Sequence, residues 1–181
     1  MPSRNTPEYY AMGLLDQILL QGDDSLLRQE LVKKHGYTAE VEGGINLLGN
    51  MYNYDGPMLW IVNLYHDQNV TPDEIIEAGD SVIEQLRAKP IDQATLDRAV
   101  IKLRSSLYGD IEGFFGFGRA DLLASFALFD DDPARINSLE AQFRKITPEI
   151  IQKTAQQYLR PTNRTVLVVE TKPVSADQKG Q

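Results

Sequence analysis

The stretch of residues 24–45 constrains the fold more than any other, because it predicts a helix, a glycine elbow and a strand in direct succession. Asp24 or Ser25 can cap the helix, and leucine and valine residues at helical spacing give it an apolar stripe. Gly36 ends the helix, since glycine readily adopts the left-handed conformation found at helix C-termini. Residues 38–45 then alternate loosely between apolar and polar, which is typical of a half-buried strand.

Three further helix starts share a threonine, a proline and then an acidic residue. This order supplies an N-cap hydroxyl, a proline at the first helical position and a negative charge in the first turn. It predicts helices that start at residues 6, 71 and 147 and run to about residues 21, 88 and 159.

Two more helices are expected between these. Asp92 caps one that we expect to be interrupted by the glycine-rich run 109–118 and to resume over residues 119–129. Asp132 and the proline after it start a short helix that runs to about Phe143.

The remaining apolar segments predict two more strands. Residues 57–65 form a strand that pairs with 38–45, and residues 164–170 form the last strand. Helices dominate, so we predict an α+β fold with a single, mostly antiparallel sheet covered by helices on one face. At 181 residues the chain suits one domain, residues 1–171, followed by a polar tail, residues 172–181, that we expect to be disordered.

The composition limits the classes of molecule that the chain is expected to bind. The formal net charge of −8 disfavours nucleic acid and anionic membrane surfaces, because both would repel the chain. With no cysteine, the chain can form neither a disulfide nor a thiolate metal site. We find no stretch apolar enough to span a bilayer and no signal peptide in the sequence as given.

Residues that commonly carry catalysis are sparse. The two histidines, His35 and His66, fall in different predicted elements, and His35 suits the electronegative C-terminal end of its helix. His66 precedes Asp67, but no G-x-S-x-G nucleophile motif accompanies them, which disfavours a serine hydrolase. We therefore predict no catalytic residue and no metal ligand, and the substrate-binding residues stay unknown.

Several other motifs have both a functional and a structural interpretation. Residues 49–56 lack the Lys-Ser/Thr pair of a P-loop, so a hairpin connection is favoured over a phosphate cradle. The run 114–118 could grip an extended peptide, but core packing at a helix break is favoured. Aspartates 130–132 lack an EF-hand loop and are interpreted as a helix cap rather than a calcium site. Glu40 and Glu42 are expected to face solvent.

Several segments, taken in their order along the chain, resemble those of a known family. The relevant segments are residues 22–27, 30–36, 146–150, 158–161 and 163–169. Together they resemble the C-terminal-type, non-zinc-binding domain of the insulinase/pitrilysin (mitochondrial-processing-peptidase-like) zinc metallopeptidase family. The resemblance implies the LuxS/processing-peptidase-like metallohydrolase fold. That fold usually has a strand before the first helix, so we expect a truncated fragment with an open sheet edge through which copies could associate.

The same resemblance implies where the chemistry lies. Active members carry an inverted zinc motif, H-x-x-E-H, in the N-terminal-type half, and this chain has none. We expect no cofactor in this chain and zinc only in the partner half. Active relatives also use an arginine and a tyrosine to hold the peptide backbone, and Val32 and Ala39 occupy these positions here. Arg28 and Tyr37 are of the right types in the wrong places.

The resemblance therefore implies an inactive, non-catalytic domain of a zinc metallopeptidase. It would form one wall of a peptide-enclosing chamber opposite a zinc-bearing half or partner subunit, with peptide as substrate. The alternative is a non-enzymatic scaffold or assembly subunit of the same fold. Resemblance to bacterial members is compatible with a periplasmic parent, although the residues themselves name no compartment.

Overall fold

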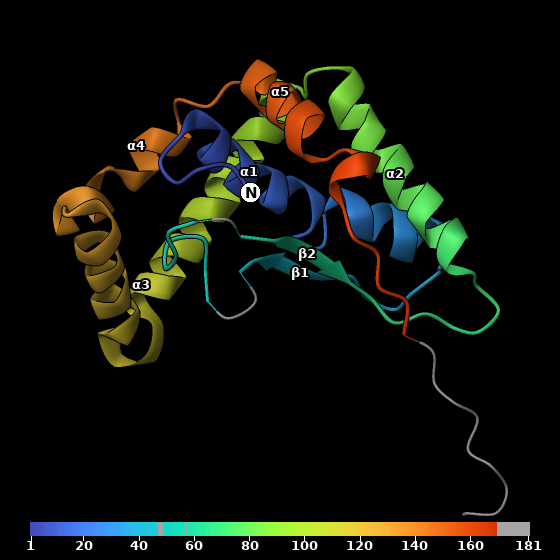
Figure 1. Ribbon diagram of the computed structural model, residues 1–181, viewed down its shortest axis with the longest axis horizontal. Coiled ribbons are helices and arrows are strands. Elements are labelled where there is room, and N and C mark those ends of the chain that lie inside the picture. Colours follow the sequence, from blue (N-terminus) through green and yellow to red (C-terminus); the bar gives the residue numbers. More distant parts are fainter. Residues whose placement is uncertain (47–48, 57, 170–181) are drawn as a thin grey trace, which may run out of the picture.

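The computed structural model of the chain describes residues 1–46, 49–56 and 58–169, with the backbone alone at 114–117. Its elements are, in order, α1 (Pro7–Leu19), η1 (Arg28–Lys34), β1 (Glu42–Ile45), β2 (Trp60–Asn63), α2 (Pro72–Ala88), α3 (Gln93–Asp130), η2 (Pro133–Ser138), α4 (Leu139–Phe143), α5 (Pro148–Tyr158) and η3 (Pro161–Asn163). Figure 1 shows α1, α2 and α5 over one face of the two-stranded sheet. The α+β class, with helices on one face of an antiparallel sheet, is confirmed.

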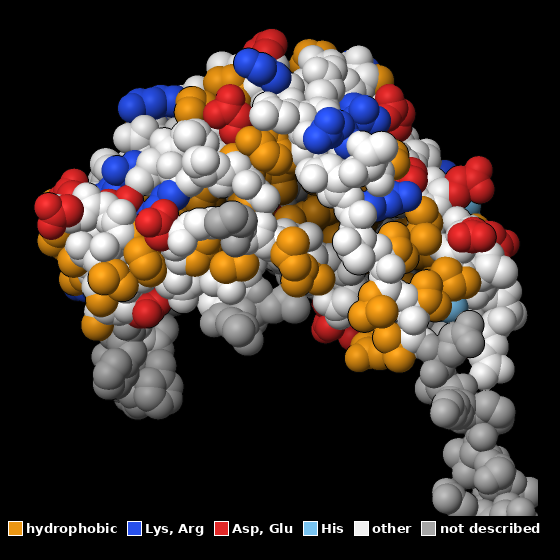
Figure 2. All heavy atoms as spheres, viewed as in Figure 1, with side chains coloured by type: hydrophobic (Ala, Val, Ile, Leu, Met, Phe, Trp, Pro, Cys, Tyr) orange, Lys and Arg blue, Asp and Glu red, His pale blue; other side chains and the backbone are white. Residues whose placement is uncertain are grey.

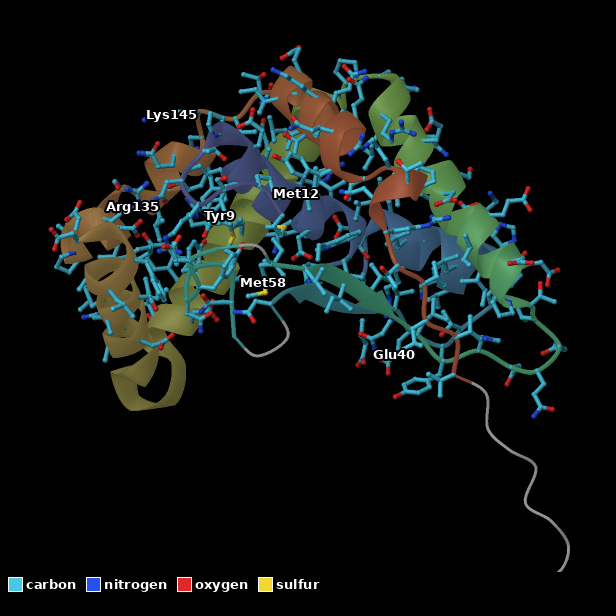
Figure 3. The ribbon with its side chains drawn as sticks, viewed as in Figure 1. Tyr9, Met12, Glu40, Met58, Arg135 and Lys145 are labelled. Carbon is cyan, nitrogen blue, oxygen red and sulfur yellow. The ribbon has the colours of Figure 1, made fainter. Side chains whose placement is uncertain are left out.

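Helix α1 forms the centre of the core. Thr6 caps it by accepting a hydrogen bond from the backbone N–H of Tyr9, as the threonine-proline-acid pattern predicts. Ten of its 13 residues are buried, because it packs against α3, α4, α5 and β1. Figure 3 shows Tyr9 and Met12 inside the molecule, and the Tyr9 hydroxyl donates to the backbone carbonyl of Met51. The connecting loop is thereby fixed to the helix.

The other threonine caps are confirmed as well. At the start of α2, the Thr71 hydroxyl and the Glu74 carboxylate satisfy each other's backbone N–H groups in a capping box. Thr147 accepts from the backbone N–H of Ile150 at the start of α5. Asp132 caps the short helical segment that begins with Pro133.

The predicted helix before Gly36 is present, with π-helical winding over Arg28–Lys34. Gly36 has a φ of +64°, the left-handed conformation that the glycine elbow requires. After it, the N–H of Tyr37 donates to the carbonyl of Leu31 across 2.9 Å, which closes the helix end. The helix packs against α2.

The sheet is shorter than predicted. β1 and β2 are antiparallel, with Ile45 opposite Trp60, whereas we expected strands over 38–45 and 57–65. Residue 57 lies outside the described residues. Thr38 forms only an isolated bridge to His66. Its hydroxyl oxygen lies 2.8 Å from the carbonyl oxygen of Glu40 and 2.6 Å from that of Tyr65, so side-chain contacts replace a continuous ladder here.

Helix α3 differs from the prediction. We expected a non-helical interruption over residues 109–118, which is wrong, because α3 is helical throughout Gln93–Asp130. The chain nevertheless reverses there, as Figure 1 shows at the lower end of α3. A side chain at Gly118 would meet the carbonyl oxygen of Asp110 at 1.6 Å, whereas eight residues of straight helix span about 12 Å. The glycines permit this reversal while helical hydrogen bonding continues.

The prediction of a last strand over residues 164–170 is also wrong for residues 164–169, which the structure describes. Residues 164–169 have no strand assignment, because no strand of the described chain pairs with them. The Arg164 guanidinium holds their start through two hydrogen bonds to Asp80. The valine and leucine side chains at 166–169 are 48–83 % exposed, and Figure 2 shows hydrophobic side chains gathered there. The predicted tail, residues 172–181, lies outside the described residues.

A buried ion pair joins the segment before α1 to the end of α3. The Arg4 guanidinium donates to both carboxylate oxygens of Asp130, and these side chains are 5 % and 3 % exposed. Arg4 also donates to the carbonyls of Tyr52 and Tyr54, at 2.6 and 3.0 Å. Burial alone would raise the pKa of Asp130, but the hydrogen bonds from Arg4 and Asn5 outweigh it and lower that pKa. One guanidinium thus joins the N-terminus, the loop and the end of α3.

We expect Arg4→Ala to lower the free energy of unfolding by about 3–5 kcal/mol, because it leaves Asp130 buried without its partner. Urea denaturation measures this. Lys34→Ala is the matched control, since Lys34 is 63 % exposed and pairs with Glu30 on a helix surface. It should cost less than about 1 kcal/mol. Equal losses in the two variants would contradict the central role of the buried pair.

Candidate functional site

The histidines do not form a metal site. His35 Nε2 lies 3.2 Å from Glu30, and its ring stacks on Tyr37. His66 is exposed, and its Nδ1 lies 2.9 Å from the carbonyl oxygen of Asp67. In the described part of the chain, no three His, Cys, Asp or Glu side chains come together as a metal site would require. The donor set does not fit a catalytic zinc ion.

The other candidate residues named from the sequence make contacts within the domain. Arg28 pairs with Asp23 at 3.2 Å, and the ring of Tyr37 stacks on that of His35. Val32 is half-buried and Ala39 is exposed. Asp130 pairs with Arg4, and Asp131 and Asp132 lie at helix ends, as the helix-cap interpretation predicts.

Three further expectations concern exposed or partly described segments. Glu40 and Glu42 are exposed, as expected, and Figure 3 places Glu40 at the lower edge of the molecule. Within 49–56, the side chain of Asn53 accepts from the backbone N–H of Asn50, so this loop is held by its own amide groups. The side chains of 114–117 lie outside the described residues. The peptide-gripping interpretation of that run therefore stays untested.

A cavity of about 450 Å³ lies between α1, β1, the loop 49–52 and α3. Its size falls in the range usual for small-ligand sites. The polar groups that converge on it include Asp16 and Gln21 near the end of α1, and Ser106 and Asp110 on α3. The cavity is therefore the candidate site that the fold itself builds.

Asp16 is the best-defined group in this cavity. It is 7 % exposed, and its Oδ1 accepts from the indole N–H of Trp60 at 2.7 Å. Its Oδ2 accepts from the side-chain amide of Gln21 at 3.1 Å. Burial raises the pKa of Asp16 to about 6, although both hydrogen bonds and the charge of Lys102 act to lower it. The carboxyl is thus fixed in orientation and costly to ionise.

Two glycines of β1 keep this carboxyl accessible. Gly43 and Gly44 have φ angles of +136° and +147°, which only glycine tolerates easily. A Cβ atom on Gly43 would lie 2.0 Å from the carbonyl oxygen of Ile61. A Cβ atom on Gly44 would lie 3.8 Å from Asp16 Oδ1, so a side chain there would grow over the carboxyl. The glycine pair allows close approach of the strands and leaves the cavity open.

The charges around the cavity are uneven. Asp110 lines it as a second carboxyl, and partial burial raises its pKa as well. No lysine, arginine or histidine of the described chain lines it. Lys102 acts on Asp16 only at longer range, because its Nζ bonds Asp24 at 2.7 Å and the carbonyl of Gln21 at 2.6 Å. The cavity is therefore acidic.

Sequence reasoning did not single out this site. One signal was available, because Asp16 is the only acid in the last part of a helix that is otherwise apolar on several sides. A buried acid needs partners. The sequence does not show that Trp60, 44 positions later, supplies one of them.

The family follows from a sequence comparison. The profile of the family described as the Peptidase M16 inactive domain matches residues 1–103, which is more than half of the chain. The chain belongs to this family. The expected resemblance to the non-zinc-binding domain of insulinase-like metallopeptidases is thereby confirmed. The matched segment of the M16 inactive domain includes α1, η1, both strands and Asp16.

Solved structures agree with this fold. A protease from Helicobacter pylori aligns with a TM-score of 0.71 and 19 % identity, over 90 % of this chain and 37 % of that one. The inactive peptidase domain of a candidate zinc protease from Bordetella parapertussis gives 0.72 and 21 %, over 91 % and 85 %. A peptidase M16 inactive domain from Pseudomonas fluorescens gives 0.66 and 20 %, over 86 % and 34 %. The comparison with curated proteins found no match.

Membership of the M16 inactive domain family means that this chain does not itself supply peptidase catalysis. The chain spans little more than a third of the Helicobacter pylori and Pseudomonas fluorescens proteins. None of the helices in the described residues combines the length and apolar character that a bilayer span requires.

The raised pKa of Asp16 predicts a specific pH dependence. Because the native pKa is about 6 and the ordinary value is 3.8, the native state binds more protons than the unfolded state between these values. Stability should therefore fall as pH rises from about 4 to about 6, by at most about 3 kcal/mol. Asp16→Asn keeps the shape and removes this titration.

Urea denaturation of both proteins from pH 4 to pH 7 tests this. The difference between Asp16→Asn and the unsubstituted chain should change in favour of the variant as pH rises. Taking this difference cancels the opposite contributions of acids such as Asp130, whose pKa is lowered. A difference that stays constant across this range would contradict the raised pKa.

Proposed function

We propose that this inactive peptidase domain forms one wall of a peptide-enclosing chamber, opposite a zinc-bearing half or partner subunit. The zinc half would polarise the scissile carbonyl, while this domain would limit which peptides fit and exclude bulk water. Zinc is accordingly proposed only for the partner half. The family membership and the larger size of two structural relatives support a protein in which this domain is one part.

We base this proposal on the face of the sheet that lies opposite the helices. Trp60 points toward the helices, because its indole reaches Asp16 on α1. Strand alternation then places Leu59 and Ile61 on the opposite face. Leu59 is 69 % exposed, and Tyr65 beyond the end of β2 is 84 % exposed. An apolar sheet face of this kind can contact an extended peptide or a facing domain.

Binding to unfolded peptides tests this function. Fluorescent peptides from a denatured, protease-digested protein should bind the chain saturably, as measured by fluorescence anisotropy. The double variant Leu59→Ser with Tyr65→Ser should weaken binding at least about tenfold, because it removes apolar contact area from the open face. Leu128→Ser, on α3 and 76 % exposed, is the matched control and should bind normally.

The outcome also separates the proposal from the scaffold alternative. A chamber wall binds peptides, whereas a purely structural assembly subunit need not. Absence of saturable binding by the unsubstituted, folded chain would overturn the proposed function. Equal losses in Leu128→Ser and the double variant would show that general surface hydrophobicity, rather than the open face, causes the binding.

A further inference from the structure

The cavity between α1, β1 and α3 has a chemistry that the open sheet face does not explain. Two of its lining side chains, Asp16 and Asp110, carry carboxyl groups, and no described lysine, arginine or histidine lines it. Lys102, whose charge acts on Asp16, is already bonded to Asp24 and to a backbone carbonyl. In a cavity of about 450 Å³, this arrangement leaves negative potential without a matching positive group.

Asp16 supplies a hydrogen-bond acceptor whose orientation is fixed by its neighbours. The Trp60 indole N–H and the Gln21 amide each donate one hydrogen bond, one to each carboxylate oxygen. A carboxylate offers about four lone-pair positions, so acceptor capacity remains on both oxygens. Because Gly44 has no side chain, that capacity is not covered from β1. The acceptor is thus preorganised and lies at the wall of an open space.

We propose that this cavity binds a cationic side chain, the ammonium of a lysine or the guanidinium of an arginine, from a bound peptide. The inference rests on the proposed function, since it assumes that peptides reach this domain. The cation would lie between Asp16 and Asp110 and would offset the cost of ionising a buried carboxyl. Hydrogen bonds to charged groups are among the stronger ones, so a neutral side chain of equal length binds less well.

The chain contains its own reporter for this site. Trp60 is the single tryptophan of the sequence, and its indole N–H bonds Asp16 directly. A cation that approaches the Asp16 carboxylate changes the electrostatic environment of the indole. Trp60 fluorescence therefore measures occupancy of the cavity separately from peptide binding elsewhere on the domain.

The experiment compares two peptides that differ at one position, lysine in one and norleucine in the other. The lysine peptide should bind at least about tenfold more tightly, as measured by anisotropy, and should shift the Trp60 emission. Free n-butylammonium, which carries the same cation without a peptide, should produce the same Trp60 shift at higher concentration. This arm separates recognition of the cation from recognition of the peptide.

Three variants locate the effect. Asp16→Asn and Asp110→Asn should each reduce the preference for lysine to less than about threefold, since each removes one carboxylate. Asp110 is exposed, so Asp110→Asn keeps the test valid if Asp16→Asn lowers stability. Glu77→Gln removes the same charge from the exposed surface of α2 and should leave the preference unchanged.

Each outcome has a distinct meaning. Equal affinity for the lysine and norleucine peptides would overturn this inference and leave the chamber-wall function intact. A Trp60 shift with n-butylammonium but no binding of either peptide would support the cation site and overturn the proposed function. No Trp60 shift with the lysine peptide or with n-butylammonium would overturn the cation site. A preference equally reduced in Glu77→Gln would also overturn it, because net charge alone would then explain the result.

Discussion

The burial of α1 on nearly every side is the constraint on which the rest of the structure depends. Its apolar residues contact α3, α5 and the sheet, so the polar groups near its two ends must find partners within the protein. At the N-terminal end, Arg4 binds Asp130 and two loop carbonyls. Toward the C-terminal end, Asp16 accepts from Trp60 on β2. These polar contacts fix how the loop, the sheet and the end of α3 lie around the central helix.

The same constraint explains why the domain has both an open apolar sheet face and an acidic cavity. Because the helices cover one face of the sheet, the apolar residues beside β2 remain open on the other. Because Gly43 and Gly44 carry no side chains, the covered side keeps an acidic cavity next to Asp16. The open face offers exposed apolar side chains, while the cavity combines two carboxyl groups with apolar lining residues such as Met51 and Leu107. Both features fit the proposed chamber wall, in which the open face would contact many peptides and the cavity would orient those with a cationic side chain.

Local signals predicted most of the helices, whereas the sheet and the site required tertiary information. The threonine caps and Gly36 act through hydrogen bonds and backbone conformation within a few residues, so the sequence alone revealed them. Residues 164–169 have strand propensity, but a strand also needs a paired neighbour, and no local pattern reports one. The glycines at 109–118 indicated that something changes in α3 there, but the predicted interruption is wrong, because the chain reverses while it stays helical. Asp16 was missed because its partner Trp60 is distant in sequence.

We propose that this domain contributes to peptide handling without catalysing cleavage. It is tested most directly by incubating the purified chain with a mixed quenched-peptide library and measuring the zinc content of the same sample. We expect no cleavage above the buffer control and no stoichiometric zinc, because the chain lacks the inverted zinc motif and belongs to the M16 inactive domain family. Stoichiometric zinc together with cleavage that a chelator abolishes would contradict it.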